Sequence, residues 1–66
     1  MTKPDRQLIV SAYVRVCKDS GFAFEATRAA AFVGGMLKIS PLDVLGAIGY
    51  DNMEQIARGE HPVCKK

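Results

Sequence analysis

The first strongly apolar segment, residues 8–17, has the spacing of a helix that faces a core. At about 100° per residue its apolar side chains form one continuous stripe. This stripe consists of Leu8, Ile9, Ala12, Tyr13, Val16 and Cys17. Val10 and Val14 lie just beyond it and widen the apolar arc to roughly 240°. Because apolar and polar residues do not alternate as in a half-buried strand, we predict a helix over residues 3–19.

A helix this apolar has two interpretations. In one, the rest of the chain surrounds it as the central helix of the core. In the other, a second molecule covers part of it, and the shared surface combines apolar residues with basic residues at its rim, since aromatic and Arg side chains carry much of the energy of protein interfaces. The predicted protein-binding residues are Val10, Tyr13, Val14, Arg15 and Lys18. On this interpretation we expect a homodimer formed through the first helix.

The pattern becomes helical again over residues 24–38, which predicts a second helix. Its apolar side is formed by Ala26, Ala29, Ala30, Val33 and Leu37. Gly34 and Gly35 complicate this helix, because each glycine inside a helix costs about 1 kcal/mol relative to alanine. The pair either bends the helix or ends it, and we favour a weakened helix that continues to about Lys38.

Three segments carry helix-start signals. Thr2 with Pro4 and Asp5 predicts the start of the first helix, and Gly21 predicts its left-handed end. Ser40 and Asp43 form a capping box around Pro41, which predicts a third helix over residues 41–48. We expect this helix to bury Leu42, Leu45 and Ile48.

The last start signal is Asp51 followed by Glu54, with Asp51 as the N-cap. It predicts a fourth helix over residues 52–58 that Gly59 ends. The expected buried residues are Met53, Ile56 and Ala57. The fold class is therefore a small all-α single domain, residues 1–66, with four helices and a mobile tail over residues 60–66 unless Val63 docks.

Composition limits the classes of function that the chain can have. A chain of 66 residues buries only about 60% of its unfolded surface, so its 48% hydrophobic content indicates dense packing or a dimer. A net charge of +2 is too mild to indicate nucleic acid by itself. No apolar segment is as long as a membrane span, and the first residues lack the pattern of a signal peptide, so we expect a cytoplasmic protein.

The chain holds few residues for chemistry. It has one histidine and two cysteines, and no nucleophile, base and orienting group suggest themselves as a set, so we expect no enzyme. His61 and Cys64 with Cys17 fall short of the four ligands of structural zinc. We therefore expect no metal, no cofactor and two free thiols.

The third and fourth helices, with the turn Gly49-Tyr50-Asp51 between them, resemble helix-turn-helix regulators in outline over about twenty residues. The resemblance implies base contacts from Asn52, Gln55 and Arg58 on the second helix of this hairpin. Candidate phosphate contacts are Arg28, Lys38, Lys65 and Lys66. The hairpin departs from the family in having Leu45 where a small residue is usual, and its second helix is short. The alternative is that Asn52, Gln55 and Arg58 form the solvated face of an αα-hairpin.

Two functions follow as expectations. The first is a non-enzymatic protein that binds a larger protein partner and modulates or inhibits it, a mode of action typical in size and style of phage and mobile-element proteins. The alternative is a dimeric DNA-binding transcriptional regulator of the helix-turn-helix kind. The salt dependence of binding distinguishes the two functions. The affinity of phosphate contacts falls steeply as the salt concentration rises, whereas that of an apolar interface does not.

Overall fold

The computed structural model describes residues 4–65, which form four α-helices and a short C-terminal 3-10 helix. The elements are α1 (Arg6–Asp19), α2 (Ala26–Leu37), α3 (Pro41–Ile48), α4 (Tyr50–Ala57) and η1 (Pro62–Lys65). The described residues contain no strand. The prediction of a small all-α domain of four helices is confirmed.

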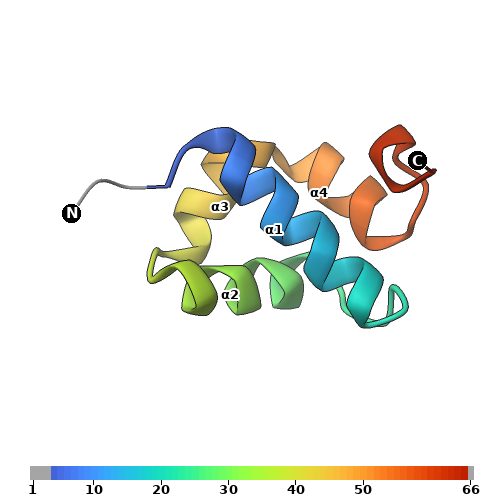
Figure 1. Ribbon diagram of the computed structural model, residues 1–66, viewed down its shortest axis with the longest axis horizontal. Helices are drawn as coiled ribbons and strands as arrows, with labels where there is room; N and C mark the ends of the chain where they lie inside the picture. The colour runs from blue at the N-terminus through green and yellow to red at the C-terminus, as the bar shows by residue number, and fades with distance from the viewer. Residues whose placement is uncertain (1–3, 66) are drawn as a thin grey trace.

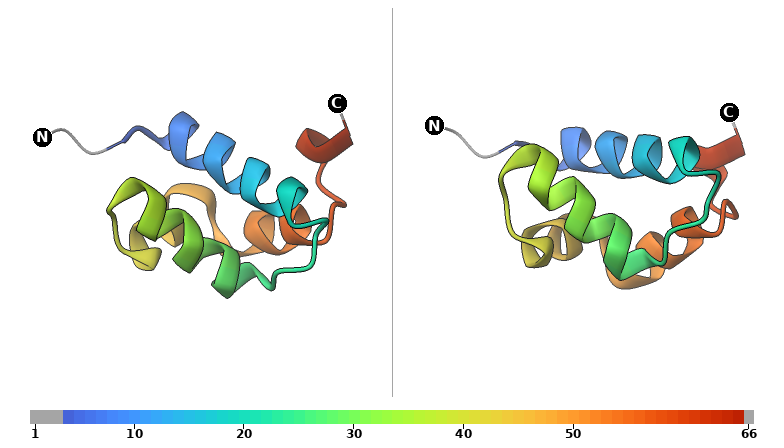
Figure 2. Two further views of the ribbon diagram at one scale, coloured as in Figure 1. Left: turned by 60° about the horizontal axis from the view of Figure 1, so that its bottom comes forward. Right: turned by 90° about the horizontal axis from the view of Figure 1, so that it is seen from below.

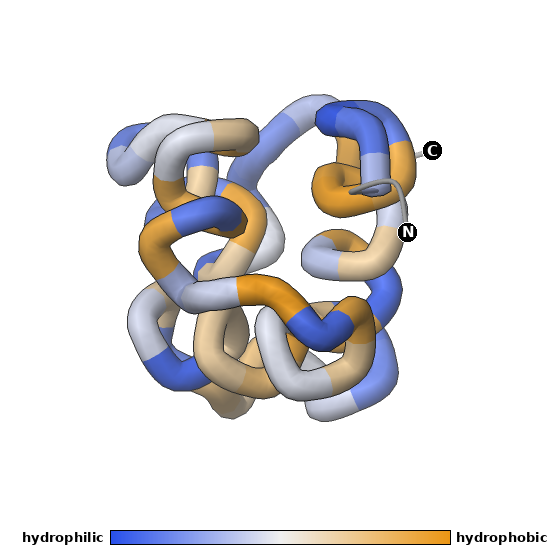
Figure 3. Tube along the Cα trace, turned by 90° about the vertical axis from the view of Figure 1, so that its left-hand side faces the viewer, coloured by the Kyte–Doolittle hydropathy of each residue, from blue (hydrophilic) through white to orange (hydrophobic). Residues whose placement is uncertain are grey.

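Helix α1 is the element that the others share. It contacts α2, α3, α4 and η1, and it lies along one side of the molecule with the other three α-helices packed against it (Figures 1 and 2). The start of α1 and η1 lie towards opposite ends of the longest dimension, which is 33 Å (Figure 1). Hydrophobic and hydrophilic stretches are both present along the trace (Figure 3), and each of the four α-helices has buried residues. Each helix therefore contributes one apolar side to a common core.

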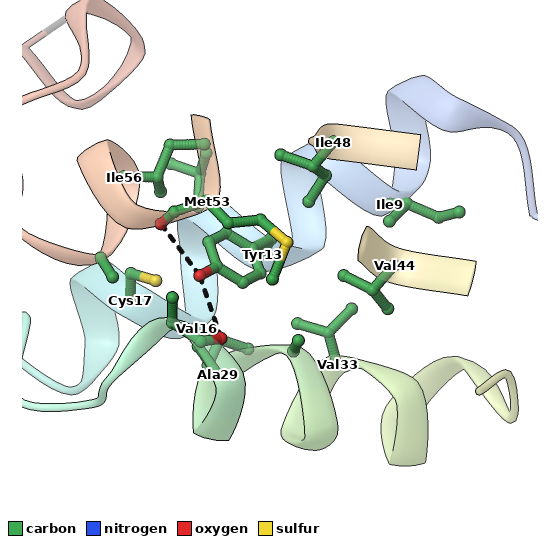
Figure 4. Packing of buried hydrophobic residues seen from close by; sticks show 14 residues of the cluster. Ile9, Tyr13, Val16, Cys17, Ala29, Val33, Val44, Ile48, Met53 and Ile56 are labelled. Atoms are coloured by element: carbon green, nitrogen blue, oxygen red, sulfur yellow. Dashed lines mark hydrogen bonds between the residues drawn. The ribbon is translucent and has the colours of Figure 1, made fainter. Parts of the chain in front are cut away.

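Tyr13 lies at the centre of this core, with no exposed surface. Its hydroxyl group is 3.0 Å from the carbonyl oxygen of Met53 and 3.3 Å from that of Ala26, so it joins α1 to α4 and to the start of α2 (Figure 4). The apolar side chains around it come from all four helices. They include Ile9, Val16, Cys17, Ala29, Val33, Val44, Ile48 and Ile56 (Figure 4). The interpretation of α1 as the central core helix fits this packing.

Helix α1 begins later than predicted. Asp5 is the N-cap, and its Oδ1 accepts a hydrogen bond of 2.7 Å from the backbone N–H of Leu8. Because Asp5 satisfies the first-turn donors itself, the helix starts at Arg6 and the prediction of a start at residue 3 is wrong. Thr2 and Lys3 lie outside the described residues. The left-handed conformation predicted at Gly21 is confirmed, with φ at 67°.

Helix α2 runs without a break through Gly34 and Gly35 to Leu37, and Lys38 caps it in the left-handed conformation. It is shorter at both ends than the predicted 24–38. Gly34 is buried, and a Cβ atom there would lie 2.7 Å from the carbonyl oxygen of Ile39. A Cβ at Gly35 would meet nothing within 4 Å. Gly34 thus lets the following turn pack directly onto the helix, and neither glycine breaks it.

Helix α3 has the predicted bounds, and both hydrogen bonds of the Ser40–Asp43 capping box are present. Its buried face is different from the predicted one. Val44 and Ile48 are buried one turn apart, whereas Leu42 is 74% exposed and Leu45 only partly buried. The prediction that Leu42 is buried is wrong, because the i, i+4 pair Val44 and Ile48 turns the first-turn leucine outward.

Helix α4 begins at Tyr50, two residues before its predicted start. Gly49, with φ at 90°, occupies the N-cap position, and no side chain caps the helix, so the predicted N-cap role of Asp51 is wrong. Glu54 instead pairs with Arg58 at 3.6 Å. Gly49 alone separates α3 from α4, so the connection is shorter than the predicted turn over residues 49–51. The predicted burial of Met53, Ile56 and Ala57 is confirmed.

The predicted mobile tail is partly docked. Residues 62–65 form η1, and Val63 and Cys64 pack against the core. The Cys64 Sγ also lies 3.7 Å from the carbonyl oxygen of Ile56. Lys66 lies outside the described residues.

Candidate interaction surfaces

Four of the five predicted protein-binding residues lie together on α1. Val10, Val14, Arg15 and Lys18 line one shallow hollow of about 310 Å³, and Val63 of η1 contributes to the same hollow. Val14 is only 8% exposed, and Arg15 pairs with Asp19 at 3.9 Å. The hollow therefore combines an apolar lining from three valines with charged side chains at its border, where Asp19 offsets the charge of Arg15.

Tyr13 is the exception among these residues. It is completely buried and its hydroxyl group is used inside the core, so it cannot contribute to a surface of the folded chain. The prediction of Tyr13 as an interface residue is corrected for this reason. Periodicity placed Tyr13 on the apolar stripe correctly, but it gave no information on which part of the stripe the other helices cover.

The predicted base-contacting residues share the exposed side of α4 but are partly engaged within the chain. Asn52 donates from its Nδ2 to the carbonyl oxygen of Ile48 at 3.1 Å, and Arg58 is paired with Glu54. Gln55 is exposed. Asp51, also exposed on this helix, adds a negative charge to the face that would approach phosphate.

The predicted phosphate contacts are not gathered in one place. Arg28 and Lys38 are both exposed, but they lie ten residues apart near the two ends of α2, which corresponds to about 15 Å of helix. Nothing is described of the Lys65 side chain, and Lys66 lies outside the described residues. The structure therefore assembles no basic patch from the residues it describes in this set.

The geometry of a helix-turn-helix occurs one element earlier than predicted, at α2 and α3. These helices are bent by 110° relative to each other across the three residues Lys38, Ile39 and Ser40. This angle and turn length are those of the motif. The small residue that the motif usually has four positions before its turn residue is present as Gly34. The signal was hidden in the sequence because Lys38, rather than a glycine, adopts the left-handed conformation.

The outward side of α3 is apolar, although the second helix of a DNA-binding unit of this geometry reads base edges. Its exposed residues are Pro41, Leu42 and Gly46. None of them carries a side-chain hydrogen-bond donor or a positive charge. Leu42 is the most exposed of the large hydrophobic side chains described.

A second apolar surface lies on α2, which sequence reasoning missed. Phe32 and Met36 are each 52% exposed, and the Phe32 ring stacks on Phe24 with centroids 5.9 Å apart. These three residues border a hollow of about 290 Å³, together with Val16 of α1 and the Arg15–Asp19 pair. The available signal was the absence of any polar side chain from Ala29 to Leu37.

Another hollow, of about 460 Å³, lies between the start of α2 and α4. Phe22 and Tyr50 border it together with the charged residues Glu25, Glu54 and Arg58. Arg58 and Glu54 pair with each other. This hollow contains no histidine or cysteine, and its lining suggests no set of nucleophile and base.

The titratable groups in the core are held in their neutral forms. Desolvation by burial, and to a smaller extent the neighbouring Cys64, raises the pKa of the Cys17 thiol to about 11. Burial likewise raises the pKa of the Tyr13 hydroxyl above its ordinary value. His61 accepts a hydrogen bond at Nδ1 from the backbone N–H of Val63. Within residues 4–65, no group of three His, Cys, Asp or Glu side chains is arranged to hold a metal ion.

Among the described residues, no single helix has both the length and the apolar character needed to cross a membrane. Comparison with known proteins adds no family assignment to this geometry. The chain matches no protein-family model, no curated protein and no solved structure.

Proposed function

We propose that this chain is a non-enzymatic regulator or inhibitor that binds a larger protein partner through the outward side of α3. The observation that carries the proposal is Leu42, which is 74% exposed on a helix held in a fixed position. An exposed leucine is ordinary by itself. Here it lies next to exposed Pro41 on the helix that a helix-turn-helix unit presents to its target.

Several contacts fix α3 in place. Its first turn is held by the Ser40–Asp43 capping box, and its last turn accepts a 2.7 Å hydrogen bond from Arg6 Nε at the carbonyl oxygen of Ala47. Val44 and Ile48 anchor its inner side in the core. A side chain presented from such a helix loses little conformational freedom on binding, which favours affinity.

A protein partner fits this surface better than DNA does. Base readout requires side-chain donors and acceptors aimed at base edges, and phosphate contacts require positive charge. The exposed residues of α3 supply neither, and the α4 face carries Asp51 beside Asn52 and Gln55. An apolar helix side is instead suited to pack against an apolar surface of another protein.

DNA binding remains the second candidate because of one observation, the 110° arrangement of α2 and α3 across a three-residue turn. On that hypothesis Arg58 on α4 and Lys38 in the turn would contribute the positive charge. The affinity would then fall steeply with salt. Protein binding through Leu42 would change little between low and high salt.

The test places a photo-crosslinking phenylalanine analogue at one position at a time in cells that naturally produce the chain. Position 42 tests α3, position 18 tests the α1 hollow, and position 55 tests α4. The proposal expects a discrete protein adduct from position 42 that Pro41→Asp weakens, and no adduct from position 55. A protein adduct from position 18 alone moves the site to α1 and overturns the assignment to α3. A nucleic-acid adduct from position 55, or no adduct from any position, overturns the proposal as a whole.

A further inference from the structure

Helix α2 is apolar on all sides, although one side is exposed. From Ala29 to Leu37 the chain has no polar side chain, yet Ala31, Phe32, Gly35 and Met36 face outward. A helix that is hydrophobic all round is normally covered on all sides. The other described elements cover only the side that contains Ala29, Ala30, Val33 and Gly34.

The exposed side of α2 has a surface shape that is self-complementary. Phe32 and Met36 form a ridge at i, i+4 spacing, and each is 52% exposed. Ala31 and Gly35 form a low lane beside the ridge at the same spacing, and a Cβ at Gly35 would meet nothing within 4 Å. Helices pack by placing the ridge of one into the groove of the other, and i, i+4 ridges do so in the commonest packing class.

We propose that a second copy of this chain covers α2, with the two α2 helices packed antiparallel about a two-fold axis. The Phe32–Met36 ridge of each copy lies in the lane formed by the partner's Ala31 and the partner's Gly35. Such an interface is isologous, so one surface has to be complementary to itself. A ridge beside an equally spaced lane fulfils this condition.

The charges fit the same occupant. The contact surface from Ala31 to Met36 is uncharged, so two copies do not repel each other at its centre. At the border of the surface, Arg15 and Asp19 neutralise each other within each copy at 3.9 Å. Arg28 is the one charged residue of α2. A parallel arrangement would bring the two Arg28 side chains together, and the antiparallel one places each near the carboxyl end of the partner's helix, where the partner's Lys38 also lies, so these end charges do not determine the direction.

The area that a stable dimer buries is a large part of the surface of this chain. Stable interfaces bury about 800 Å² per partner, which is roughly a fifth of the 4458 Å² that the described chain exposes. Helix α2 is about 18 Å long for its 12 residues, and Phe24 with the 290 Å³ hollow beside Phe32 extends the contact towards α1. Burial of this surface adds apolar contacts to a domain whose own core is small.

The experiment is the mass of the purified full chain by sedimentation equilibrium over a range of micromolar concentrations, in low and high salt. The proposal expects a dimer of twice 7.2 kDa that persists in high salt. Phe32→Asp places a charge in the interface and raises the dissociation constant about tenfold or more. Gly35→Leu fills the lane and has the same effect, while its better helix propensity keeps the monomer folded.

Leu42→Asp is the matched control, because Leu42 is also a large exposed hydrophobic residue but lies on α3. It leaves the dimer intact. A wild-type chain that stays monomeric at all concentrations overturns the inference, as does a dimer that survives Gly35→Leu with an unchanged dissociation constant. The dimer and the α3 surface are separate, so failure of the inference leaves the proposed function standing, and loss of the partner adduct from position 42 leaves the dimer standing.

Discussion

The two longest helices of the chain, α1 and α2, differ in how much of their apolar surface the fold covers. Most of the apolar stripe of α1 is buried by contacts with α2, α3, α4 and η1, with Leu8 left 49% exposed, and its central residue Tyr13 has no exposed surface. From Ala29 to Leu37, α2 has no polar side chain, yet Phe32 and Met36 remain half exposed. The chain thus uses its own helices to cover most of α1, whereas α2 keeps an exposed apolar side, as α3 does at Leu42. An apolar helix side is stable when it is covered, and the arrangement of the neighbouring helices determines whether the same chain provides this cover.

The two helices are expected to differ most in the free energy of unfolding that is lost when one aromatic side chain is removed from each. Tyr13→Ala removes a fully buried ring and leaves the carbonyl oxygens of Met53 and Ala26 without their bond to the hydroxyl group. We expect it to lower the free energy of unfolding by about 3–5 kcal/mol, enough to unfold most chains of this size. The measurement is urea unfolding followed by circular dichroism.

Phe32→Ala is the control on α2. In dilute solution, where the chain is monomeric, it removes a half-exposed ring and is expected to change the unfolding midpoint much less than Tyr13→Ala. At high concentration its effect should grow, because association with a second folded copy stabilises the wild type. Equal losses for both variants in dilute solution would contradict the contrast between the two helices.

Local signals predicted the elements well where the decisive contacts lie within a few residues. The Ser40–Asp43 capping box determines the start of α3 by itself, so its bounds were predicted correctly. The starts of α1 and α4 were misplaced because more than one residue near each could cap the helix. In the structure, Asp5 caps α1, and Gly49 occupies the cap position of α4.

The candidate surfaces were harder to predict, because exposure depends on contacts between distant segments. The pattern placed Tyr13 and Val14 on the apolar side of the first helix, but only the packing of α4 and α2 shows that Tyr13 is covered. The sequence pattern predicted Leu42 as a core residue, but burial of Val44 and Ile48 orients α3 so that Leu42 is exposed. The position of the helix-turn-helix geometry depended on the left-handed Lys38, which residue type alone did not indicate.

A smaller effect is expected at the point where α2 meets α3. Gly34→Ala places a Cβ 2.7 Å from the carbonyl oxygen of Ile39 and 3.4 Å from the backbone nitrogen of Pro41, so the turn has to move. We expect a loss of about 1–3 kcal/mol from overpacking, larger than the gain in helix propensity. The measurement is the urea midpoint of the variant.

Gly46→Ala is the matched control for this substitution. Gly46 lies in α3, and a Cβ there would meet nothing within 4 Å, so the variant is expected to gain up to about 1 kcal/mol from helix propensity. A Gly34→Ala variant as stable as Gly46→Ala would show that the turn does not pack tightly on α2.

The smallest expected effects concern the starts of α1 and α2, which also differ. Asp5 caps α1 through its 2.7 Å hydrogen bond to the N–H of Leu8, whereas Glu25 occupies the N-cap position of α2 without a side-chain bond. Asp5→Ala is expected to lower the free energy of unfolding by about 1 kcal/mol.

Glu25→Asp should raise the free energy of unfolding by several tenths of that amount. The backbone of Glu25 is already extended, with φ at −69° and ψ at 158°, and the shorter carboxylate can accept from the first-turn N–H groups. Both changes are read as shifts of the thermal midpoint in opposite directions. If Glu25→Asp shifts the midpoint downward like Asp5→Ala, the longer side chain of Glu25 already stabilises α2 through the helix dipole, and the two helices start in more similar ways than their hydrogen bonds indicate.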